Sequence, residues 1–274
     1  MRPVKSTVQR FLQTRLSPAR FRKIRTCWWS AKVYLFEKAR ATLADRRPRV
    51  FGVQSDLVVT LRAVDVFVRT RMCRIMNKYG SDKGSGWHNY TTIYSKIFRE
   101  LPKRHLTIIE LGIGTNNPSL PSTMGIAGRP GASLRGWREC FPDADIFGAD
   151  IDRSILFTED RIQTYYCDQL DRRTIDDLWG QPGLRNGADI IVDDGLHTFE
   201  ANASFLGASL PYLRDGGFYV TEDIHRSDLE KWRQHLPIYS IEFPDCDFAL
   251  VELSNSLNQH DNNMMIARRR CSRT

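Results

Sequence analysis

Hydrophobic residues follow two alternating patterns from residue 106 onward. Short apolar runs predict buried strands at 106–111, 145–150, 161–166, 190–192 and 217–221. Helical spacing predicts helices at 133–140, 171–179, 198–213 and 227–235. Further short strands are expected at 238–243, 248–253 and 263–267. Because parallel strands need long crossover connections, this order predicts an α/β fold with a doubly wound, mostly parallel sheet.

The residues before 106 predict helices and one long loop. Apolar residues at helical spacing predict a helix over 55–76, and another is expected at 91–101. Between them, residues 77–90 are rich in glycine and polar residues, and a loop of this length is typical of a lid or substrate wall. We therefore divide the chain into an N-terminal extension (1–54), a helical cap or lid segment (55–104) and a main domain (105–274).

The net charge of +8 is distributed unevenly along the chain. Residues 1–50 contain 14 Lys or Arg against Glu37 and Asp45, which leaves the other 224 residues with a net charge of −4. The main domain is therefore not expected to bind nucleic acid. The extension predicts a basic amphipathic helix over 28–43, which could pack on a partner or lie peripherally on an anionic membrane. Its Arg-rich composition also resembles a transit peptide.

Two further features concern the compartment. No apolar run approaches the roughly 20 residues of a spanning helix, and basic residues interrupt any secretory signal. The six cysteines are scattered without a C-x-x-C pair, which argues against a zinc ribbon or a dense disulfide framework. We expect a cytoplasmic protein that forms a homo-oligomer.

A glycine turn and two acids mark a nucleotide-binding edge. Glu110 ends the first strand and is followed by Gly112 and Gly114, which permit a tight turn and a close approach of backbone to ligand. Asp150 ends the second strand, where it can accept hydrogen bonds from ribose hydroxyls, and Asp168-Gln169 follow the third strand, where they suit an adenine edge. The third glycine of a dinucleotide fingerprint is missing, which disfavours that class.

Acidic residues and a histidine follow two other predicted strands. The 190–192 strand ends in Asp193 and Asp194, with His197 shortly after, and the 217–221 strand ends in Glu222 and Asp223. In an open α/β sheet ligands bind outside the carboxyl ends of strands, so this pattern predicts a metal site with a base beside it. The alternative for Asp193-Asp194 alone is a cap of the next helix.

The motifs together resemble those of a known family. The acid-x-Gly-x-Gly turn and the acids after the next two strands are similar to class I S-adenosylmethionine-dependent methyltransferases. The runs Y-G-S-D-K-G at 79–84, G-A-S-L-R-G-W at 131–137, D-G-L-H at 194–197 and E-D at 222–223 resemble the mycinamicin-type O-methyltransferases, which methylate a deoxysugar hydroxyl. The resemblance covers residues 77–223 and leaves out the basic extension.

This resemblance implies a cofactor, a metal and roles for the residues. The 105–274 domain would bind S-adenosylmethionine through Glu110, Gly112, Gly114, Asp150, Asp168 and Gln169, with Asp193 orienting its neighbours or meeting the cofactor. Mg²⁺ would be held by Asp194, Glu222 and Asp223. His197 would be the general base, with His225 as an alternative base.

The resemblance implies an O-methyltransferase that acts on a sugar hydroxyl of a glycoside or glycan. Two alternatives are kept. One is a metal-dependent hydroxylase, although iron oxygenases usually use two histidines and one carboxylate. The other is a non-catalytic protein on this fold that docks to a membrane or partner through its basic arm.

Overall fold

The computed structural model describes residues 46–255 and 257–271, so the expected helix at 28–43 lies outside the described residues. Residues 45–274 form one compact unit, built on a single nine-stranded sheet. The strand order is β1-β8-β9-β7-β6-β2-β3-β5-β4. The strands are β1 (Arg49–Phe51), β2 (Thr107–Leu111), β3 (Asp145–Asp150), β4 (Thr158–Glu159), β5 (Ile162–Tyr166), β6 (Ala188–Asp193), β7 (Leu213–Thr221), β8 (Cys246–Glu252) and β9 (Asn263–Arg269).

The middle of the sheet is parallel and its edges are antiparallel. Strands β5, β3, β2, β6 and β7 pair in parallel, whereas β4, β9, β8 and β1 join by antiparallel pairing. The predicted α/β class is confirmed, but the sheet is mixed: its five central strands are parallel as predicted, and four antiparallel strands extend it at both edges. The chain leaves β2 for β3 on one side and returns to β6 on the other, so a topological switch point lies between β2 and β6, where ligands bind in this architecture.

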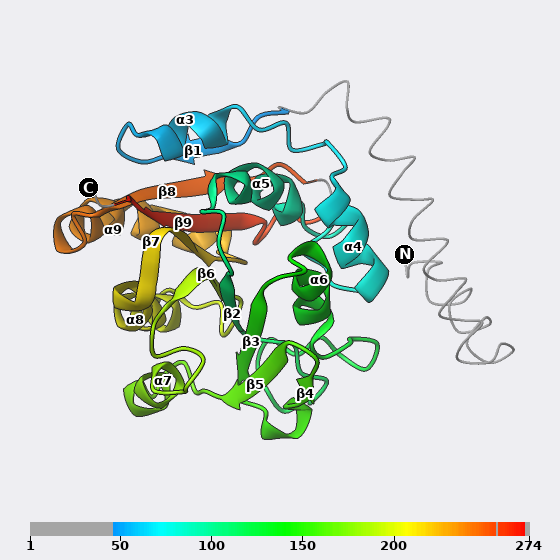
Figure 1. The fold of residues 1–274 in the computed structure, drawn as a ribbon. Coiled ribbons are helices and arrows are strands. Elements are labelled where there is room, and N and C mark those ends of the chain that lie inside the picture. The colour runs from blue at the N-terminus through cyan, green and yellow to red at the C-terminus, as the bar shows by residue number, and fades with distance from the viewer. Residues whose placement is uncertain (1–45, 256, 272–274) are drawn as a thin grey trace, which may run out of the picture. The chain divides into compact units, whose positions relative to one another are not determined.

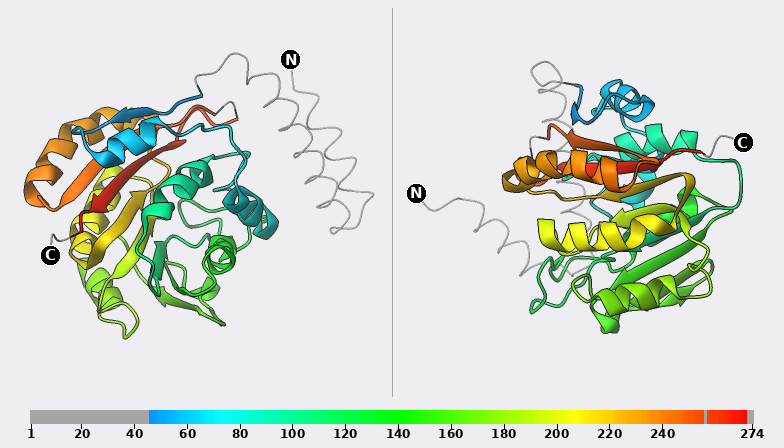
Figure 2. Two further views of the ribbon diagram at one scale, coloured as in Figure 1. Left: turned by 45° about the horizontal axis from the view of Figure 1, so that its top comes forward. Right: turned by 90° about the vertical axis from the view of Figure 1, so that its left-hand side faces the viewer.

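Successive residues of each central strand pack on opposite faces of the sheet. Ile190 and Val192 of β6 belong to one core cluster, and Ile191 between them belongs to the other. Helices α3 (Asp56–Arg62), α4 (Arg71–Tyr79), α5 (Tyr90–Ile97) and α6 (Ala132–Cys140) cover the first face. Helices α7 (Arg172–Trp179), α8 (Phe199–Ser209) and α9 (Leu229–Glu242) cover the second (Figures 1 and 2). Burial on both faces explains why these strands lack polar alternation.

Two predicted elements differ from the structure. The helix expected at 55–76 is two helices, because α3 ends at Arg62 and α4 begins only after Thr70, whose hydroxyl caps it. The strand expected at 238–243 is wrong, since these residues lie in or next to the last turns of α9. Tyr239 packs in the core, whereas Ile238 and Ile241 are exposed on the helix surface. Packing of Tyr239 with the rest of α9 therefore overrides the β propensity of the isoleucines.

Strand β1 lies within the segment that we predict as the N-terminal extension. It pairs with β8 and forms one edge of the sheet. None of the described helices is long and apolar enough to cross a membrane.

Candidate active site

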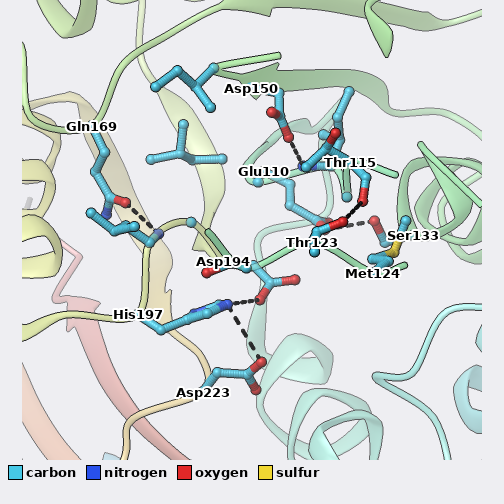
Figure 3. Close-up of a pocket in the computed structure, with 18 of the residues that line it drawn as sticks. Glu110, Thr115, Thr123, Met124, Ser133, Asp150, Gln169, Asp194, His197 and Asp223 are labelled. Atoms are coloured by element: carbon cyan, nitrogen blue, oxygen red, sulfur yellow. Dashed lines mark hydrogen bonds and ion pairs between the residues drawn. The ribbon is translucent and has the colours of Figure 1, made fainter. Parts of the chain in front are cut away.

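The carboxyl ends of the five parallel strands open on one cleft of about 390 Å³. The cleft is lined from β2 by Glu110, Gly112 and Gly114, from β3 by Asp150, and from β5 by Asp168 and Gln169. Asp194 and His197 after β6 and Asp223 after β7 line its other part (Figure 3). Sheet topology thus brings together residues separated by more than 100 positions in the sequence. The volume suits a small-molecule site.

The turn after β2 packs directly on the turn after β6. Gly112 has φ +83°, and a Cβ built there would lie 1.9 Å from the Asp194 carbonyl oxygen. The Asp194 amide in turn donates to the Leu111 carbonyl at 2.8 Å. Only glycine combines this backbone conformation with this approach. The glycine turn therefore fixes the position of Asp194 relative to the predicted nucleotide-binding edge.

Asp150 is held by the same glycine turn. Its Oδ2 accepts from the Ile113 amide and its Oδ1 from the Asp152 amide, both at 2.9 Å. Burial raises the pKa of Asp150, and these backbone hydrogen bonds oppose the rise. Carboxylate oxygens accept more than one hydrogen bond, so Asp150 can still accept from a ligand in the cleft.

The predicted adenine-edge residues also organise the loop after β6. Gln169 donates to Asp193 Oδ1 at 2.7 Å and accepts from the Leu196 amide at 2.8 Å. Asp193 is fully buried and also accepts from Asn202 at 2.9 Å. Burial raises the pKa of Asp193 to about 7. Asp193 is therefore buried behind the cleft and is not one of the residues that line it. Asp168 does line the cleft, and its carboxylate accepts a hydrogen bond from the Leu170 amide.

Glu110 is buried at the floor of the cleft. It accepts from the Ser133 hydroxyl at 2.6 Å and from the Trp137 indole N–H at 2.5 Å. These two partners lie in the 131–137 run, so one part of that run serves to hold Glu110.

Asp194, His197 and Asp223 converge at the acidic end of the cleft (Figure 3). His197 Nε2 lies 3.9 Å from Asp194 Oδ1 and 3.8 Å from Asp223 Oδ2. His197 and Asp223 have positive φ angles of 59° and 52°, which non-glycine residues rarely adopt. A strained backbone conformation persists only where the surrounding structure holds it in place, and such residues cluster at functional sites.

Lys83 is a site residue with no role predicted from the sequence. Its side chain is 2% exposed, and its Nζ contacts Asp194 Oδ2 and Glu222 Oε2 and lies 3.4 Å from Glu110 Oε1. Burial alone would lower the pKa of Lys83, but the carboxylates of Asp194, Glu110 and Glu222 raise it well above its usual value. Burial also raises the pKa of Asp194 and Glu222, and the Lys83 ammonium opposes that rise.

The hydroxyl groups of two buried tyrosines hold Glu222 and Asp223 in place. The Tyr94 hydroxyl donates to Glu222 Oε1, and the Tyr90 hydroxyl donates to Asp223 Oδ1 at 2.7 Å. His88 stacks on Tyr90, and its Nδ1 lies 3.4 Å from Asp223 Oδ1. Tyr90 and His88 are both buried, so neither is a solvated residue at the end of the long loop.

The sequence contained a signal for some of these residues. Lys83 lies in the Y-G-S-D-K-G run of the long loop, and Ser81, Asp82 and Lys83 line the cleft, which supports the substrate-wall interpretation of this loop. Tyr94 lies inside a helix and carried no signal beyond hydrophobicity. His225, the alternative base, is exposed, accepts from Ser227 and does not line the cleft.

The acidic end of the cleft offers ligands for a divalent cation. One ligand atom each from Asp194, His197 and Asp223 lies within 4.8 Å of the others. Carboxylate oxygens are the ligands that Mg²⁺ prefers, so two of these three fit that ion. Glu222, the third predicted ligand, lies next to Asp223 but contacts Lys83 and Tyr94.

Known proteins with similar sequences are sugar O-methyltransferases. The 8-demethyl-8-alpha-L-rhamnosyl tetracenomycin-C 2'-O-methyltransferase of Streptomyces olivaceus is 31% identical over 208 residues, which are 74% of this chain and 48% of that protein. The 8-demethyl-8-(2-methoxy-alpha-L-rhamnosyl)-tetracenomycin-C 3'-O-methyltransferase of the same organism is 33% identical over 65% of this chain and 43% of its own length. The Mycinamicin VI 2''-O-methyltransferase of Micromonospora griseorubida is 30% identical over 56% and 36%. The chain thus spans less than half of the length of these relatives, and no protein-family model matches it.

A solved structure shares the fold. The MycE methyltransferase in complex with Mg and SAH aligns with a TM-score of 0.55 and 24% identity, over 74% of this chain and 56% of that one. A second MycE structure, which also holds mycinamycin VI, aligns with a TM-score of 0.53 over the same share of this chain. The chain therefore has the class I S-adenosylmethionine-dependent methyltransferase fold. The sequence resemblance to sugar O-methyltransferases is also confirmed.

Proposed function

We propose that the protein is an S-adenosylmethionine-dependent, Mg²⁺-assisted O-methyltransferase that acts on a sugar hydroxyl of a glycoside or glycan. The observation that carries this proposal is the contact between the two turns. Gly112 of the nucleotide-binding edge packs on the backbone of Asp194 in the acidic cluster, so donor and acceptor sites share one cleft. An enzyme that transfers a group between two ligands needs this juxtaposition.

The donor half of the cleft would hold S-adenosylmethionine through residues of three strand ends. The Gly112–Gly114 turn would approach the methionine part, with Glu110 beneath it. Asp150 would accept from the ribose hydroxyls, and Asp168 with Gln169 would border the adenine. Asp193 would not contact the cofactor itself but would hold Gln169 in place, because it accepts hydrogen bonds from Gln169 and Asn202.

The acidic half would hold Mg²⁺ through Asp194, Asp223 and Glu222. When bound, S-adenosylmethionine supplies an activated methyl group and Mg²⁺ supplies positive charge that lowers the pKa of a nearby hydroxyl. Tyr90 and Tyr94 would orient Asp223 and Glu222, since each hydroxyl donates to one of these carboxylates. The cluster contains one histidine, whereas iron oxygenases use two, which favours methyl transfer over hydroxylation.

His197 would accept the proton of the acceptor hydroxyl as its oxygen forms the new bond to the methyl carbon. It lines the cleft beside both Asp194 and Asp223, and its side chain is 26% exposed, so an acceptor can reach it. Histidine is the side chain that most commonly serves as a general base near neutral pH. His225 lies outside the cleft lining and is therefore the weaker candidate for the base.

The acceptor class rests on the relatives. The names of the relatives specify sugar-bearing tetracenomycin and mycinamicin acceptors, and vicinal sugar hydroxyls suit a site with a divalent cation. A cytoplasmic location, a homo-oligomer, the absence of nucleic-acid binding, and peripheral membrane contact through the basic arm remain predictions from the sequence.

Calorimetric titration of the pure protein with S-adenosylmethionine tests the donor site. Incubation with a panel of rhamnosides and other deoxysugar glycosides, with mass spectrometry of the products, tests the transfer. We expect a mass gain of one methyl group that EDTA abolishes and added Mg²⁺ restores. Absence of S-adenosylmethionine binding would refute the proposal, and turnover indifferent to EDTA would refute the metal.

A further inference from the structure

The buried ammonium of Lys83 joins the two halves of the cleft. It contacts Asp194 after β6 and Glu222 after β7, and it lies 3.4 Å from Glu110 at the end of β2. Glu110 belongs to the donor side, where it also binds Ser133 and Trp137. Asp194 and Glu222 belong to the acidic side. One cation is therefore shared by carboxylates of both sides.

The two oxygens of Asp194 face two different places. Oδ2 contacts the Lys83 ammonium, whereas Oδ1 is the oxygen nearest His197, at 3.9 Å. A cation held at the Asp194–His197–Asp223 cluster would thus share the Asp194 carboxylate with Lys83. The Lys83 ammonium and the bound cation are both positive and would share the Asp194 carboxylate, so each weakens the binding of the other.

The charges of the cleft can be counted from these contacts. We define the four-carboxylate cluster as Glu110, Asp194, Glu222 and Asp223. Each has a carboxylate oxygen no farther than 3.8 Å from Lys83 Nζ or His197 Nε2. Ionised, it carries four negative charges, of which Lys83 neutralises one. A divalent cation and a sulfonium together supply the remaining three. S-adenosylhomocysteine is a neutral thioether, so once His197 has released the proton that it accepts during transfer, the product complex leaves one negative charge uncompensated.

We propose that Lys83 is a positioning residue that acts as a fixed countercation between the metal and donor sides of the cleft. It weakens metal binding and limits the preference of the cleft for the sulfonium donor over the thioether product. Without it, the four-carboxylate cluster would attract both mobile cations more strongly, because unpaired anions in a buried site interact strongly with nearby cations. This inference rests on the proposed function.

The test measures binding to the full chain and does not depend on turnover. Mn²⁺, followed by electron paramagnetic resonance, is the probe for the metal, and calorimetry gives the affinities for S-adenosylmethionine and S-adenosylhomocysteine. For Lys83→Met we expect Mn²⁺ to bind roughly tenfold tighter or more. We expect the ratio of S-adenosylmethionine to S-adenosylhomocysteine affinity to rise roughly threefold or more, because one buried positive charge is gone.

Two matched variants separate charge from shape. Lys83→Arg keeps the charge and should hold the affinity ratio within about twofold of the wild type, since the guanidinium still pairs with carboxylates. Lys78→Met makes the same substitution on the exposed face of α4, where Lys78 pairs with Glu139, and should change neither affinity. If Lys83→Met does not fold by circular dichroism, Lys83→Gln takes its place with the same expectation.

The outcomes distinguish this inference from the function beneath it. A wild type that binds neither S-adenosylmethionine nor Mn²⁺ refutes the proposed function. A wild type that binds both, with a folded Lys83→Met whose Mn²⁺ affinity and donor-to-product ratio are unchanged, overturns the role of Lys83 alone.

Discussion

His197 lies where two roles can be told apart by experiment. Its Nε2 faces Asp194 and Asp223 at distances just beyond a hydrogen bond, so it could take a proton or complete a metal site. As the general base, its loss in His197→Ala should lower kcat by roughly 10²–10⁴ while Mn²⁺ affinity changes little. The measurement pairs single-turnover methyl transfer with a Mn²⁺ titration on the same protein. Parallel loss of Mn²⁺ binding would instead make His197 a ligand.

His225→Ala is the matched control for that experiment. His225 is exposed, pairs with Ser227 of its own loop and stacks on His260 of the connection between β8 and β9. We expect its substitution to leave methyl transfer within about twofold of the wild type, because surface changes away from a site have small effects. A larger loss in His225→Ala than in His197→Ala would exchange their assignments.

Asp193 predicts a pH dependence of stability. Burial raises the pKa of this carboxyl to about 7 in the folded protein, above its value in an unfolded chain. The folded state therefore holds a proton that the unfolded state releases, and the associated stability is lost as the pH rises from about 4 through about 7. Between pH 5 and pH 8 the free energy of unfolding should fall by roughly 2 kcal/mol more in the wild type than in Asp193→Asn. Urea denaturation across this range measures both slopes, and equal slopes would contradict the assignment.

At the residue scale the sequence identified acids and the histidine but not their partners. Asp194, His197 and Asp223 were predictable because each follows a strand whose carboxyl end meets the others at one edge of the sheet. The burial of Lys83 was not predictable, because a lysine in a glycine-rich loop usually lies in water. Its position depends on carboxylates 27, 111 and 139 residues away along the chain.

At the element scale, the contact between the β2 and β6 turns is the feature most sensitive to substitution. Gly112→Ala would place a methyl group 1.9 Å from the Asp194 carbonyl oxygen and would require φ +83° of an alanine. We expect a loss of about 1–3 kcal/mol of stability, since a non-glycine residue at such a φ costs that much. We also expect loss of measurable S-adenosylmethionine binding, because the turn must move. Thermal denaturation and calorimetry on one preparation report both effects.

Gly207 is the control for the Gly112 experiment. It lies in α8, exposed, and a Cβ there would meet nothing within 4 Å. Gly207→Ala should stabilise the protein by about 0.5–1 kcal/mol, because alanine favours a helix and loses less chain entropy on folding. It should leave S-adenosylmethionine affinity unchanged. A Gly112→Ala protein with normal stability and binding would show that the turns can separate without cost.

Elements at the sheet centre were predictable, and those at its edges were less so. The five parallel strands were predictable from their continuous apolar runs, which are typical of strands buried on both faces of a sheet. Helix α9 was partly missed, because Pro237 and the isoleucines after it favour a break and a strand. Strand β1 is three residues long and depends on pairing with β8, which no local pattern encodes.

At the scale of the whole molecule, the described lining of the cleft comes from one compact unit. Residues 45–274 form this unit, and the described residues that line the cleft belong to it. Within this unit Arg46 pairs with Asp65 at 2.5 Å, and β1 completes one edge of the sheet. The start of this unit therefore falls close to residue 45 and before β1.

Two deletions test this boundary and the role of the arm. Removing residues 1–44 takes away eleven Lys or Arg and one Glu, a net charge of +10, but leaves Arg46 and β1 in place. We expect S-adenosylmethionine affinity within about twofold of the full chain, and loss of any binding to vesicles that contain phosphatidylserine, since each basic residue near such a surface contributes about 1 kcal/mol. Removing residues 1–54 also deletes β1 and exposes the edge of β8, so it should lower the midpoint of thermal unfolding by several degrees, about 2–4 °C for each kcal/mol lost. If both deletions have the same midpoint of thermal unfolding, the boundary of the unit lies elsewhere. If the shorter deletion still binds the vesicles, the arm is not the membrane contact.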